Sequence, residues 1–397
     1  MPEPYPVLIA GAGPVGLVAA AALQRRGVPV TVLEAEPALP PELRGSTFHA
    51  PTLDMLDDLG AAKPMIAEGL VAPHLQYRDR ASGGVIAEFD FRALADVSRH
   101  PFRLQCEQFK LTRILAGLLK DRPGAEIRFG ARLESARDEG DGVSVTLADG
   151  STLRGSWLIG ADGAHSVARR AAGLEFQGFT WPERFLVLST PFDFTTLIPG
   201  LRDVSYFADA TEWFFLLHVP GLWRALFPTD PAMDEAEIMS ESFADARMAG
   251  IVPGHGGYEI RHKTLYRVHQ RVAEGFRRGR ILLAGDAAHI NNPLGGMGLN
   301  GGAHDAVNLA GRLAAVWHGE AAEDQLDLYD RQRRLVCIEH VQAQTIRNKE
   351  NLEAKDEAAR QAFRDRMRDT AADPVRAHAF LMQASMITSL RRAAEIT

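Results

Sequence analysis

Residues able to bind a flat, polar ligand gather in the segment 280–312. The mostly apolar run at 280–284 is typical of a buried strand, and Asp286 follows it in a short turn, where its carboxylate can accept hydrogen bonds from ligand hydroxyls. Five glycines in 295–302 let the backbone approach a ligand closely. A helix predicted to start near 302–303 presents unpaired N–H groups and a partial positive charge. We expect this segment to bind an anionic ring edge or a carbonyl oxygen; the competing interpretation is a surface loop with turn glycines.

The N-terminal residues carry another glycine-rich turn, in a strand–turn–helix–strand context. An apolar strand over 5–10 runs into GAGPVG at 11–16, an Ala-rich helix over 17–26 follows, and a second strand over 28–34 ends at Glu34. This arrangement is typical of a dinucleotide-binding βαβ unit. A lone G-x-G-x-x-G motif is weak, but the strands, the helix and the acidic residue together favour a dinucleotide site.

The residues of this turn have distinct expected roles. Gly11 allows the tight turn, Gly13 lets a pyrophosphate approach the backbone, and Gly16 lets the helix pack closely on the strand. Glu34 is expected to accept hydrogen bonds from a ribose diol. The neighbouring residues that we also assign to cofactor binding are Pro14, Val15 and Ala35.

The middle of the chain repeats the strand-and-turn pattern and then changes character. A buried strand at 157–160 ends in ADGAHSVARR at 161–170, which predicts a Gly/Asp turn and a helix start. Strands and aromatic residues dominate 175–275, and alternation within 212–219 suggests an antiparallel sheet with one buried face. Most of these rings are expected in the core, and a minority in a pocket for a planar ligand.

Composition and charge argue against several classes of protein. The 397 residues are 46% hydrophobic and 24% charged, which is ordinary for a soluble globular chain of two or three domains. A net charge of −7 without a long basic run argues against nucleic-acid binding. Cys106 and Cys337 are the two cysteines, so we expect no disulfide framework and no metal site. With no secretory signal and no apolar run long enough for a membrane span, a cytoplasmic enzyme is expected.

Three motifs taken together resemble those of the group A flavoprotein aromatic hydroxylases, the para-hydroxybenzoate hydroxylase family. The motifs are GAGPVG at 11–16 with Glu34, GADGAHSVARR at 160–170, and GDAAH at 285–289 followed by GGMGLN at 295–300. The resemblance covers the chain to about residue 345 and is weakest in 175–275 and after 345. It implies an α/β fold with a Rossmann-like FAD-binding domain, interrupted by a mostly antiparallel β-sheet substrate domain that covers the flavin, and with C-terminal helices.

The domain boundaries that we expect follow this resemblance. They assign 1–74, 98–174 and 276–345 to the FAD-binding domain, 75–97 and 175–275 to the substrate domain, and 346–397 to a C-terminal helical segment. Within the first part of the substrate domain, Ser82-Gly83-Gly84 separates two strand-like runs and predicts a hairpin.

The resemblance also implies roles for individual residues. Arg44 lies where the family has an arginine near the FAD phosphates, and Gln108 where a helix-start glutamine contacts the ribityl chain; a solvated arginine and a water-facing helix residue are the alternatives. Pro293 occupies the position of a proline beside the reactive edge of the flavin, and His289 is expected to be structural. The other residues expected at FAD, or at both FAD and NAD(P)H for the 160–170 motif, are Asp162, Gly163, Arg169, Gly285, Asp286, Gly296, Gly298, Leu299 and Asn300.

The implied activity is aromatic hydroxylation. NAD(P)H reduces FAD, the reduced flavin reacts with O₂ to a C4a-hydroperoxide, and a small aromatic or heteroaromatic, phenol-like substrate receives one oxygen atom. A base that ionises a phenol would help, and the sheet-domain candidates are His218 and Tyr206, for which a core or surface role is the competing interpretation.

Other activities stay open at this point. Epoxidation, Baeyer–Villiger oxidation, halogenation or reduction would keep the flavin and change the reaction, and a non-catalytic flavoprotein binder is a further alternative. The sequence does not decide the identity of the substrate, NADH against NADPH, or the oligomeric state, for which a homodimer is one candidate.

Overall fold

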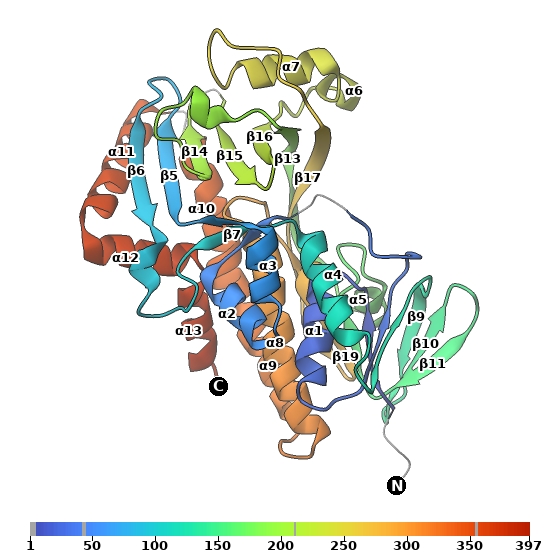
Figure 1. The fold of residues 1–397 in the computed structure, drawn as a ribbon. Coiled ribbons are helices and arrows are strands. Elements are labelled where there is room, and N and C mark those ends of the chain that lie inside the picture. The colour runs from blue at the N-terminus through green and yellow to red at the C-terminus, as the bar shows by residue number, and fades with distance from the viewer. Residues whose placement is uncertain (1–4, 42–44, 210–211, 354–355) are drawn as a thin grey trace.

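The computed structural model of the chain describes residues 5–41, 45–209, 212–353 and 356–397. A lower region is built around a mainly parallel sheet, and an upper region is built around a larger, mainly antiparallel sheet (Figure 1). Within the described residues, no helix is both long and apolar enough to cross a membrane.

The lower region is organised around a six-stranded sheet. Its strand β1 has only buried residues and pairs in parallel with β2 on one side and with β12 on the other. The strands in spatial order are β18 (Arg277–Arg278), β19 (Ile281–Leu283), β12 (Leu158–Gly160), β1 (Val7–Ala10), β2 (Val30–Leu33) and β8 (Ala125–Arg128). Since parallel neighbours need a crossover, helix α1 (Pro14–Gln24) connects β1 to β2, as the glycine-rich turn predicts.

Helix α8 (Met297–Trp317) begins earlier than the sequence predicts. A start near 302–303 was expected because a cluster of glycines usually marks a loop. Gly296 instead adopts a left-handed conformation with a φ of 69° and leads directly into the helix, so the later glycines of this segment belong to its first turns.

The glycine at position 302 lets α8 pack against the N-terminal unit. A Cβ on Gly302 would lie 2.5 Å from Cγ2 of Val15 in α1 and 3.0 Å from Cα of Gly285 in the turn after β19. Real Cβ atoms do not approach other atoms so closely, so the missing side chain sets the distance between the two helices and that turn.

The upper region contains an eight-stranded sheet. Its spatial order is β20 (His289–Ile290), β17 (His262–Ala273), β13 (Phe176–Thr190), β16 (Leu222–Pro228), β15 (Phe214–Val219), β14 (Val204–Ala208), β5 (His74–Asp79) and β6 (Val85–Asp90). Neighbours are antiparallel except β14 and β5, which run in parallel. The predicted hairpin is therefore present as β5–β6, and the predicted antiparallel sheet is confirmed.

Shorter elements surround these two sheets. One small sheet consists of β3 (Thr47–Phe48), β7 (Arg103–Gln105) and β4 (Leu70–Ala72), and another of β11 (Thr152–Gly155), β10 (Val143–Leu147) and β9 (Leu133–Asp138). Besides α1, the helices before residue 250 are α2 (Ala50–Asp58), α3 (Ala62–Glu68), α4 (Gln108–Leu119), α5 (Val167–Ala171), α6 (Glu235–Ile238) and α7 (Glu241–Ala249). Short 3₁₀ turns are η1 (Phe91–Leu94), η2 (Phe194–Thr196) and η3 (Gly285–Ala287).

The C-terminal helices cover one face of the eight-stranded sheet. They follow α8 as α9 (Asp324–Val336), a π-helical turn η4 (Cys337–Gln342), α10 (Ala343–Leu352), α11 (Glu357–Ala372), α12 (Pro374–Ala384) and α13 (Ile387–Glu395). Phe363 and Met367 of α11 and Leu381 of α12 share one apolar core with Phe89 and Tyr206 of the sheet, and α11 lies beside β6 (Figure 1). The residues after 345 are thus part of the upper region's core.

The packing of α8 generates a prediction about two glycines of the same helix. Gly302→Ala should lower the free energy of unfolding by about 1–3 kcal/mol, because overpacking forces neighbouring backbone apart, and it should weaken retention of the bound cofactor. Gly311→Ala is the matched control: its Cβ would meet its nearest neighbour, Arg26 Nη2, at 3.9 Å, so it should stabilise the helix by up to about 1 kcal/mol. Thermal unfolding of both variants measures the difference, and equal Tm values would contradict the packing argument.

Candidate functional site

Three turns meet at the carboxyl end of the parallel sheet, where ligands bind in open α/β folds. Gly11 has a φ of 98°, and a Cβ there would lie 2.5 Å from the carbonyl oxygen of Ala161. A Cβ on Gly16 would lie 2.0 Å from the carbonyl oxygen of Gly11. At Gly13 and Gly163, in contrast, a Cβ would meet no protein atom within 4 Å, so the described residues leave these turns open to a ligand.

The Glu34 carboxylate faces the first turn from the end of β2. Its Oε2 accepts a hydrogen bond from the Ala12 N–H at 2.7 Å, and its Oε1 accepts one from the Glu36 N–H at 2.9 Å. Each carboxylate oxygen can accept a further hydrogen bond. Glu34 therefore fixes the turn and keeps the capacity to bind a ribose hydroxyl, which together with the open space at Gly13 fits the pyrophosphate and ribose of FAD.

Two predicted FAD residues from distant segments come close together. Gln108 begins α4, and its Oε1 accepts a hydrogen bond from the Gly45 N–H at 3.3 Å. A Cβ on Gly45 would lie 3.5 Å from Cδ2 of Leu299, in the first turn of α8. Asp286 is exposed in the turn after β19, and Arg44 lies outside the described residues.

Asp162 and Arg169 hold backbone groups of the second and third turns. Oδ2 of Asp162 accepts a hydrogen bond from the Val167 N–H at 2.6 Å and so caps α5. Arg169 is buried, and it donates to the carbonyl oxygens of Ala164 at 2.8 Å and of Ala287 at 2.9 Å. Since Ala287 belongs to the turn after β19, Arg169 fixes these two turns relative to each other.

The side chain of Asn300 connects α8 to the strand β3. Its Oδ1 accepts a hydrogen bond from the His49 N–H at 2.9 Å, and its Nδ2 donates to the carbonyl oxygens of Thr47 at 2.9 Å and of Gly296 at 2.6 Å. The backbone N–H groups of residues 297–299 open this helix and have no partner within it. These N–H groups and the positive end of the helix dipole suit the anionic edge of a flavin.

Hydrogen bonds within the loop that carries Pro293, and between this loop and α10, hold the loop in place. The carbonyl oxygen of Pro293 accepts a hydrogen bond from the Gly296 N–H at 3.0 Å. The buried Asn292 donates through Nδ2 to the Thr345 carbonyl oxygen at 3.0 Å and accepts through Oδ1 from the Leu294 N–H at 3.1 Å. Asn292 thereby holds this loop against α10, with Pro293 itself exposed.

A small pocket lies where the start of α8 meets the eight-stranded sheet. Gly295 and Met297 line it from the loop and helix, Tyr77 and Tyr206 line it from the sheet, and α10 and α12 close it. The Gly295 N–H donates to Tyr206 Oη at 3.2 Å, and the Tyr206 ring stacks on Tyr77 at 5.4 Å between centroids. The volume of about 20 Å³ holds a single water molecule, so a larger ligand requires the walls of this pocket to move apart.

The same pocket contains a buried cation that sequence patterns did not single out. Arg103 of β7 is 2% exposed and lines the pocket. Its Nη2 donates to the Ala384 carbonyl oxygen at 3.3 Å, its guanidinium carbon lies 5.1 Å from the centroid of Phe91, and its Nε has no hydrogen-bond partner. Among the described residues, no carboxylate lies within ion-pair distance of this guanidinium. An unpaired buried charge is costly, so Arg103 is suited to an anionic ligand group.

His218 lies on the other face of the sheet from this pocket. Its ring stacks on Trp223 at 4.5 Å between centroids, and its Nδ1 lies 2.9 Å from Oδ1 of Asp203. Trp223 belongs to the core on that face, whereas Tyr206 belongs to the core that borders the C-terminal helices. The structure therefore separates the two residues that the sequence suggested as bases, and only Tyr206 is near the pocket. In the described part of the chain, no three His, Cys, Asp or Glu side chains are grouped to hold a metal ion.

A buried charge network lies behind α8. Asp305 is fully buried, and its carboxylate accepts hydrogen bonds from Arg333 Nε at 2.7 Å and from the Gly285 N–H at 3.1 Å. His289 Nε2 lies 2.7 Å from the same carboxylate. Burial opposes protonation of His289, yet the side chain of Cys337 and the carboxylate of Asp305 raise its pKa well above the ordinary value. The network thus holds the turn after β19 against α8 and α9.

Sequence reasoning missed Arg103 and the partners of His289. Arg103 stands within an apolar strand-like run, Phe102-Arg103-Leu104, and a charged residue in such a run is a signal that could have been used. His289 was expected to be structural, which agrees with its contacts, but no spacing rule connects it to Asp305 or Arg333.

With this geometry established, comparison with known proteins gives the class. The model of the FAD binding domain family matches residues 4–344. The chain belongs to this family of FAD-binding proteins, and the resemblance to FAD-dependent aromatic hydroxylases seen in the motifs is confirmed.

Individual relatives are monooxygenases of aromatic compounds. The chain is 35% identical to para-nitrophenol 4-monooxygenase of Pseudomonas sp. (strain WBC-3) over 362 residues, which cover 89% of each protein. It is 36% identical to 6-hydroxy-3-succinoylpyridine 3-monooxygenase of Pseudomonas putida (strain DSM 28022 / S16) over 87% of this chain and 88% of the relative. The crystal structure of p-nitrophenol 4-monooxygenase from Pseudomonas putida DLL-E4 superposes with a TM-score of 0.90 at 32% identity, covering 96% of this chain and 98% of that one.

The buried network generates a prediction about pH. A raised pKa in the folded state means that protonated His289 stabilises the fold fully below its ordinary pKa of about 6.5, and that this contribution is lost as the pH rises through the raised value. His289→Gln keeps a side-chain N–H donor for Asp305 but does not titrate. The variant should therefore be less stable than wild type at pH 6, and the difference should shrink toward pH 10.

Urea unfolding at several pH values measures this difference. His165→Gln, at an exposed position, is the control and should give the same small difference at every pH. A His289→Gln difference that is independent of pH would mean that His289 is neutral in the fold.

Proposed function

We propose that this protein hydroxylates a small phenol-like ring, using FAD, NAD(P)H and O₂. The overall reaction converts ArH, O₂, NAD(P)H and H⁺ into ArOH, H₂O and NAD(P)⁺, so that one oxygen atom enters the ring and the other leaves as water. Support comes from the family, from relatives that act on a nitrophenol and on a hydroxypyridine, and from the pocket that contains Arg103.

The protein's contribution is to place and shield the cofactor. Bound FAD supplies the redox chemistry, taking electrons from NAD(P)H and activating O₂. The turns at Gly11, Gly13 and Gly163 and the carboxylate of Glu34 would hold its pyrophosphate and ribose. The first turn of α8, at 297–299, would face its ring system with N–H groups, and the eight-stranded sheet with the C-terminal helices would exclude water.

The observation that carries the proposal is the unpaired guanidinium of Arg103 in a pocket beside the start of α8. A phenolate oxygen bound by Arg103 would gain a charge-assisted hydrogen bond, and ionisation makes a phenol ring richer in electrons and more reactive toward an electrophilic oxygen. Arg103 would therefore both orient the substrate and favour its reactive form, which reduces the need for a separate base.

Two tyrosines give the pocket a second polar side. Burial, together with the neighbouring Tyr206, raises the pKa of Tyr77 well above its ordinary value, so Tyr77 stays a neutral phenol that can donate a hydrogen bond. The hydroxyl of Tyr206 accepts from the Gly295 N–H and can donate its own proton onward. These groups suit a ring substituent that carries oxygen, such as a hydroxyl or nitro group.

The proposed function can be tested with the FAD-loaded protein and a panel of phenols that includes 4-nitrophenol. We expect NADH or NADPH oxidation to accelerate at least about tenfold with a suitable phenol, with O₂ consumed and a hydroxylated product formed in equal amounts. Reductant oxidation without O₂ uptake would favour a reductase. Binding of a phenol without any turnover would favour a non-catalytic flavoprotein.

Substitution of the buried arginine tests the role of Arg103. A hydrogen bond to a charged group contributes about 1.5–3 kcal/mol, so Arg103→Gln should weaken binding of 4-nitrophenolate roughly tenfold or more, measured as the change in flavin absorbance on titration. Arg103→Lys keeps the charge without the planar fork and should give an intermediate loss.

The control for this series is Arg113→Gln, on the exposed face of α4 where Arg113 pairs with Glu68. Its Kd for 4-nitrophenolate should equal that of wild type. In wild type the affinity should rise as the pH passes through the pKa of the phenol, and Arg103→Gln should lose this dependence; a variant that keeps it would show that Arg103 does not bind the phenolate.

A further inference from the structure

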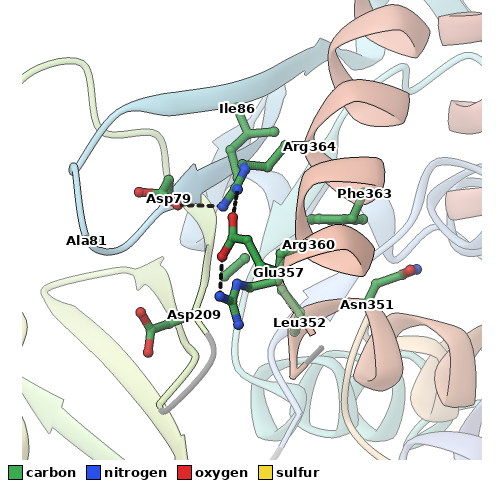
Figure 2. Close-up of a pocket in the computed structure, with 11 residues that line it drawn as sticks. Asp79, Ala81, Ile86, Asp209, Asn351, Leu352, Glu357, Arg360, Phe363 and Arg364 are labelled. Atoms are coloured by element: carbon green, nitrogen blue, oxygen red, sulfur yellow. Dashed lines mark hydrogen bonds and ion pairs between the residues drawn. The ribbon is translucent and has the colours of Figure 1, made fainter. Parts of the chain in front are cut away.

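A second, larger cavity lies farther from α8, between the β5–β6 hairpin and the C-terminal helices. It has a volume of about 140 Å³. The hairpin contributes Asp79 and Ile86, and the helices contribute Leu352 and Phe363 (Figure 2). The end of β14 contributes Ala208. Guanidinium and carboxylate groups of α11 stand at its rim, so this cavity has an apolar floor and a charged rim.

The two cavities share a thin wall. Leu352 lines both of them. Phe363 lines the outer cavity and contacts Tyr77 of the inner pocket edge to face, at 5.9 Å between centroids and 75° between planes. A single layer of side chains therefore separates the outer cavity from the pocket that contains Arg103.

The volumes show which cavity can take a ring in this conformation. An apolar cavity of about 150 Å³ binds benzene, whereas one water needs about 10–15 Å³. At about 140 Å³ the outer cavity fits one aromatic ring, and at about 20 Å³ the inner pocket fits one water. A phenol can thus occupy the outer cavity first and reach the inner pocket only when the wall yields.

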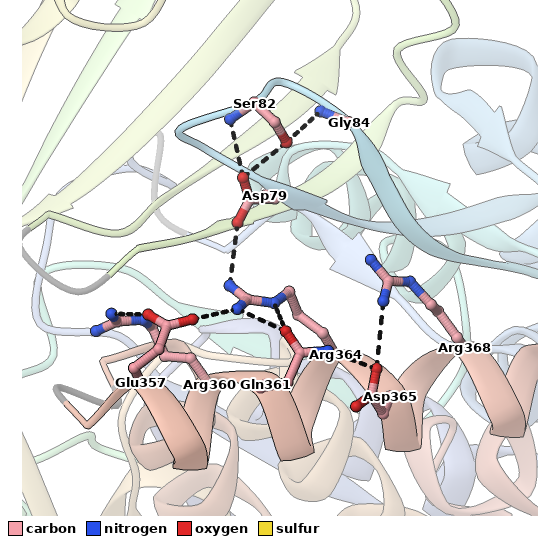
Figure 3. A network of polar contacts seen from close by, with 9 residues as sticks. All are labelled: Asp79, Ser82, Gly84, Glu357, Arg360, Gln361, Arg364, Asp365 and Arg368. Atoms are coloured by element: carbon pink, nitrogen blue, oxygen red, sulfur yellow. Dashed lines mark hydrogen bonds and ion pairs between the residues drawn. The ribbon is translucent and has the colours of Figure 1, made fainter.

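One polar contact joins the hairpin to α11 at the rim. Nη1 of Arg364 lies 3.5 Å from Oδ2 of Asp79, and Nη2 of Arg364 lies 2.5 Å from Oε1 of Glu357 on its own helix (Figure 3). The other Asp79 oxygen accepts hydrogen bonds from the Ser82 N–H at 2.8 Å and from the Ser82 Oγ at 2.7 Å. The contact within α11 is short and the contact across the rim is long, so the Arg364–Asp79 contact is the weaker of the two.

The contact between Arg364 and Asp79 is an ion pair at neutral pH. Burial opposes ionisation of Asp79, yet the hydrogen bonds from Ser82 and the charge of Arg364 hold the pKa of this carboxyl below its ordinary value. The side chains of Arg364 and Asp79 are 18% and 23% exposed, so water and small solutes reach them from outside.

We propose that the outer cavity is an antechamber through which the phenol substrate enters, and that the Arg364–Asp79 contact is the latch that holds α11 against the β5–β6 hairpin. The inference rests on the proposed function and adds the substrate's path. The ring occupies the apolar floor beside Phe363, and its hydroxyl takes a hydrogen bond at the rim in place of the latch. Outward movement of α11 then lets Leu352 and Phe363 part and admits the ring to Arg103.

An antechamber has a kinetic signature that a binding residue lacks. A residue on the entry path changes the rates of association and dissociation together. It leaves Kd nearly unchanged, because it contacts the phenol neither before entry nor after the phenol is bound at Arg103. Stopped-flow mixing of the FAD-loaded protein with 4-nitrophenol, followed by the change in flavin absorbance, gives both rates and their ratio.

Two variants move the rates in opposite directions. Asp79→Asn keeps Oδ1 for Ser82 but replaces the acceptor facing Arg364 with an NH₂ group, so both rates should rise at least about threefold with Kd within about twofold. Ala208→Leu fills the antechamber from β14, so both rates should fall by a similar factor. Arg368→Gln is the control, since Arg368 is one turn farther along α11 and pairs with Asp365 of the same helix (Figure 3); its rates should match wild type.

The outcomes separate the antechamber from the proposed function. If wild type binds 4-nitrophenol and both variants keep the wild-type rates, the antechamber is wrong and the proposed function stands. A change in Kd through dissociation alone would also overturn it, because Asp79 or Ala208 would then act on the bound state. If wild type binds no phenol of the panel, the proposed function fails and the antechamber fails with it. Tm values of all variants confirm that each is folded.

Discussion

The carboxylate of Asp305 is the interaction on which the rest of the proposed flavin site depends. It is fully buried in α8 and binds the Gly285 N–H in the turn after β19, His289 in β20 and Arg333 in α9. Removing one partner of a buried ion pair leaves the other as an uncompensated buried charge, at a cost of about 3–5 kcal/mol. This carboxylate thereby holds α8, α9, β20 and the turn after β19 in one arrangement, so this part of the proposed flavin site keeps its shape before any cofactor arrives.

Features that depend on neighbouring residues could be predicted from the sequence. The βαβ unit follows from glycines at fixed offsets between two apolar runs, and the β5–β6 hairpin follows from a Ser-Gly-Gly turn between alternating segments. The start of α8 could not be predicted from the sequence, because glycines of its first turns are typical of a loop. Only the three-dimensional neighbours of Gly302 show that a helical residue without a side chain is needed at this position.

Features that depend on distant residues were beyond sequence patterns. Asn300 and Thr47 are bonded across 253 positions, and no periodicity connects them. The pocket that contains Arg103 is also assembled from distant residues. It is lined by Arg103 of β7, Tyr206 of β14 and Phe380 of α12, which belong to three different thirds of the chain. Residues after 345, where the motifs give out, close this pocket, so the part of the chain with the weakest resemblance determines the shape of the ligand's surroundings.

The parallel pairing of β5 with β14 also sets the order in which the protein can form during its synthesis. Gln76 and Ser205, which face each other across that pair, are 129 positions apart. The hairpin therefore leaves the ribosome long before its partner strand, and the helices that cover Leu75 and Phe89 are made last. Such non-local contacts fold slowly and leave apolar surface uncovered meanwhile. The eight-stranded sheet therefore cannot be completed until β14 and the strands after it have been made.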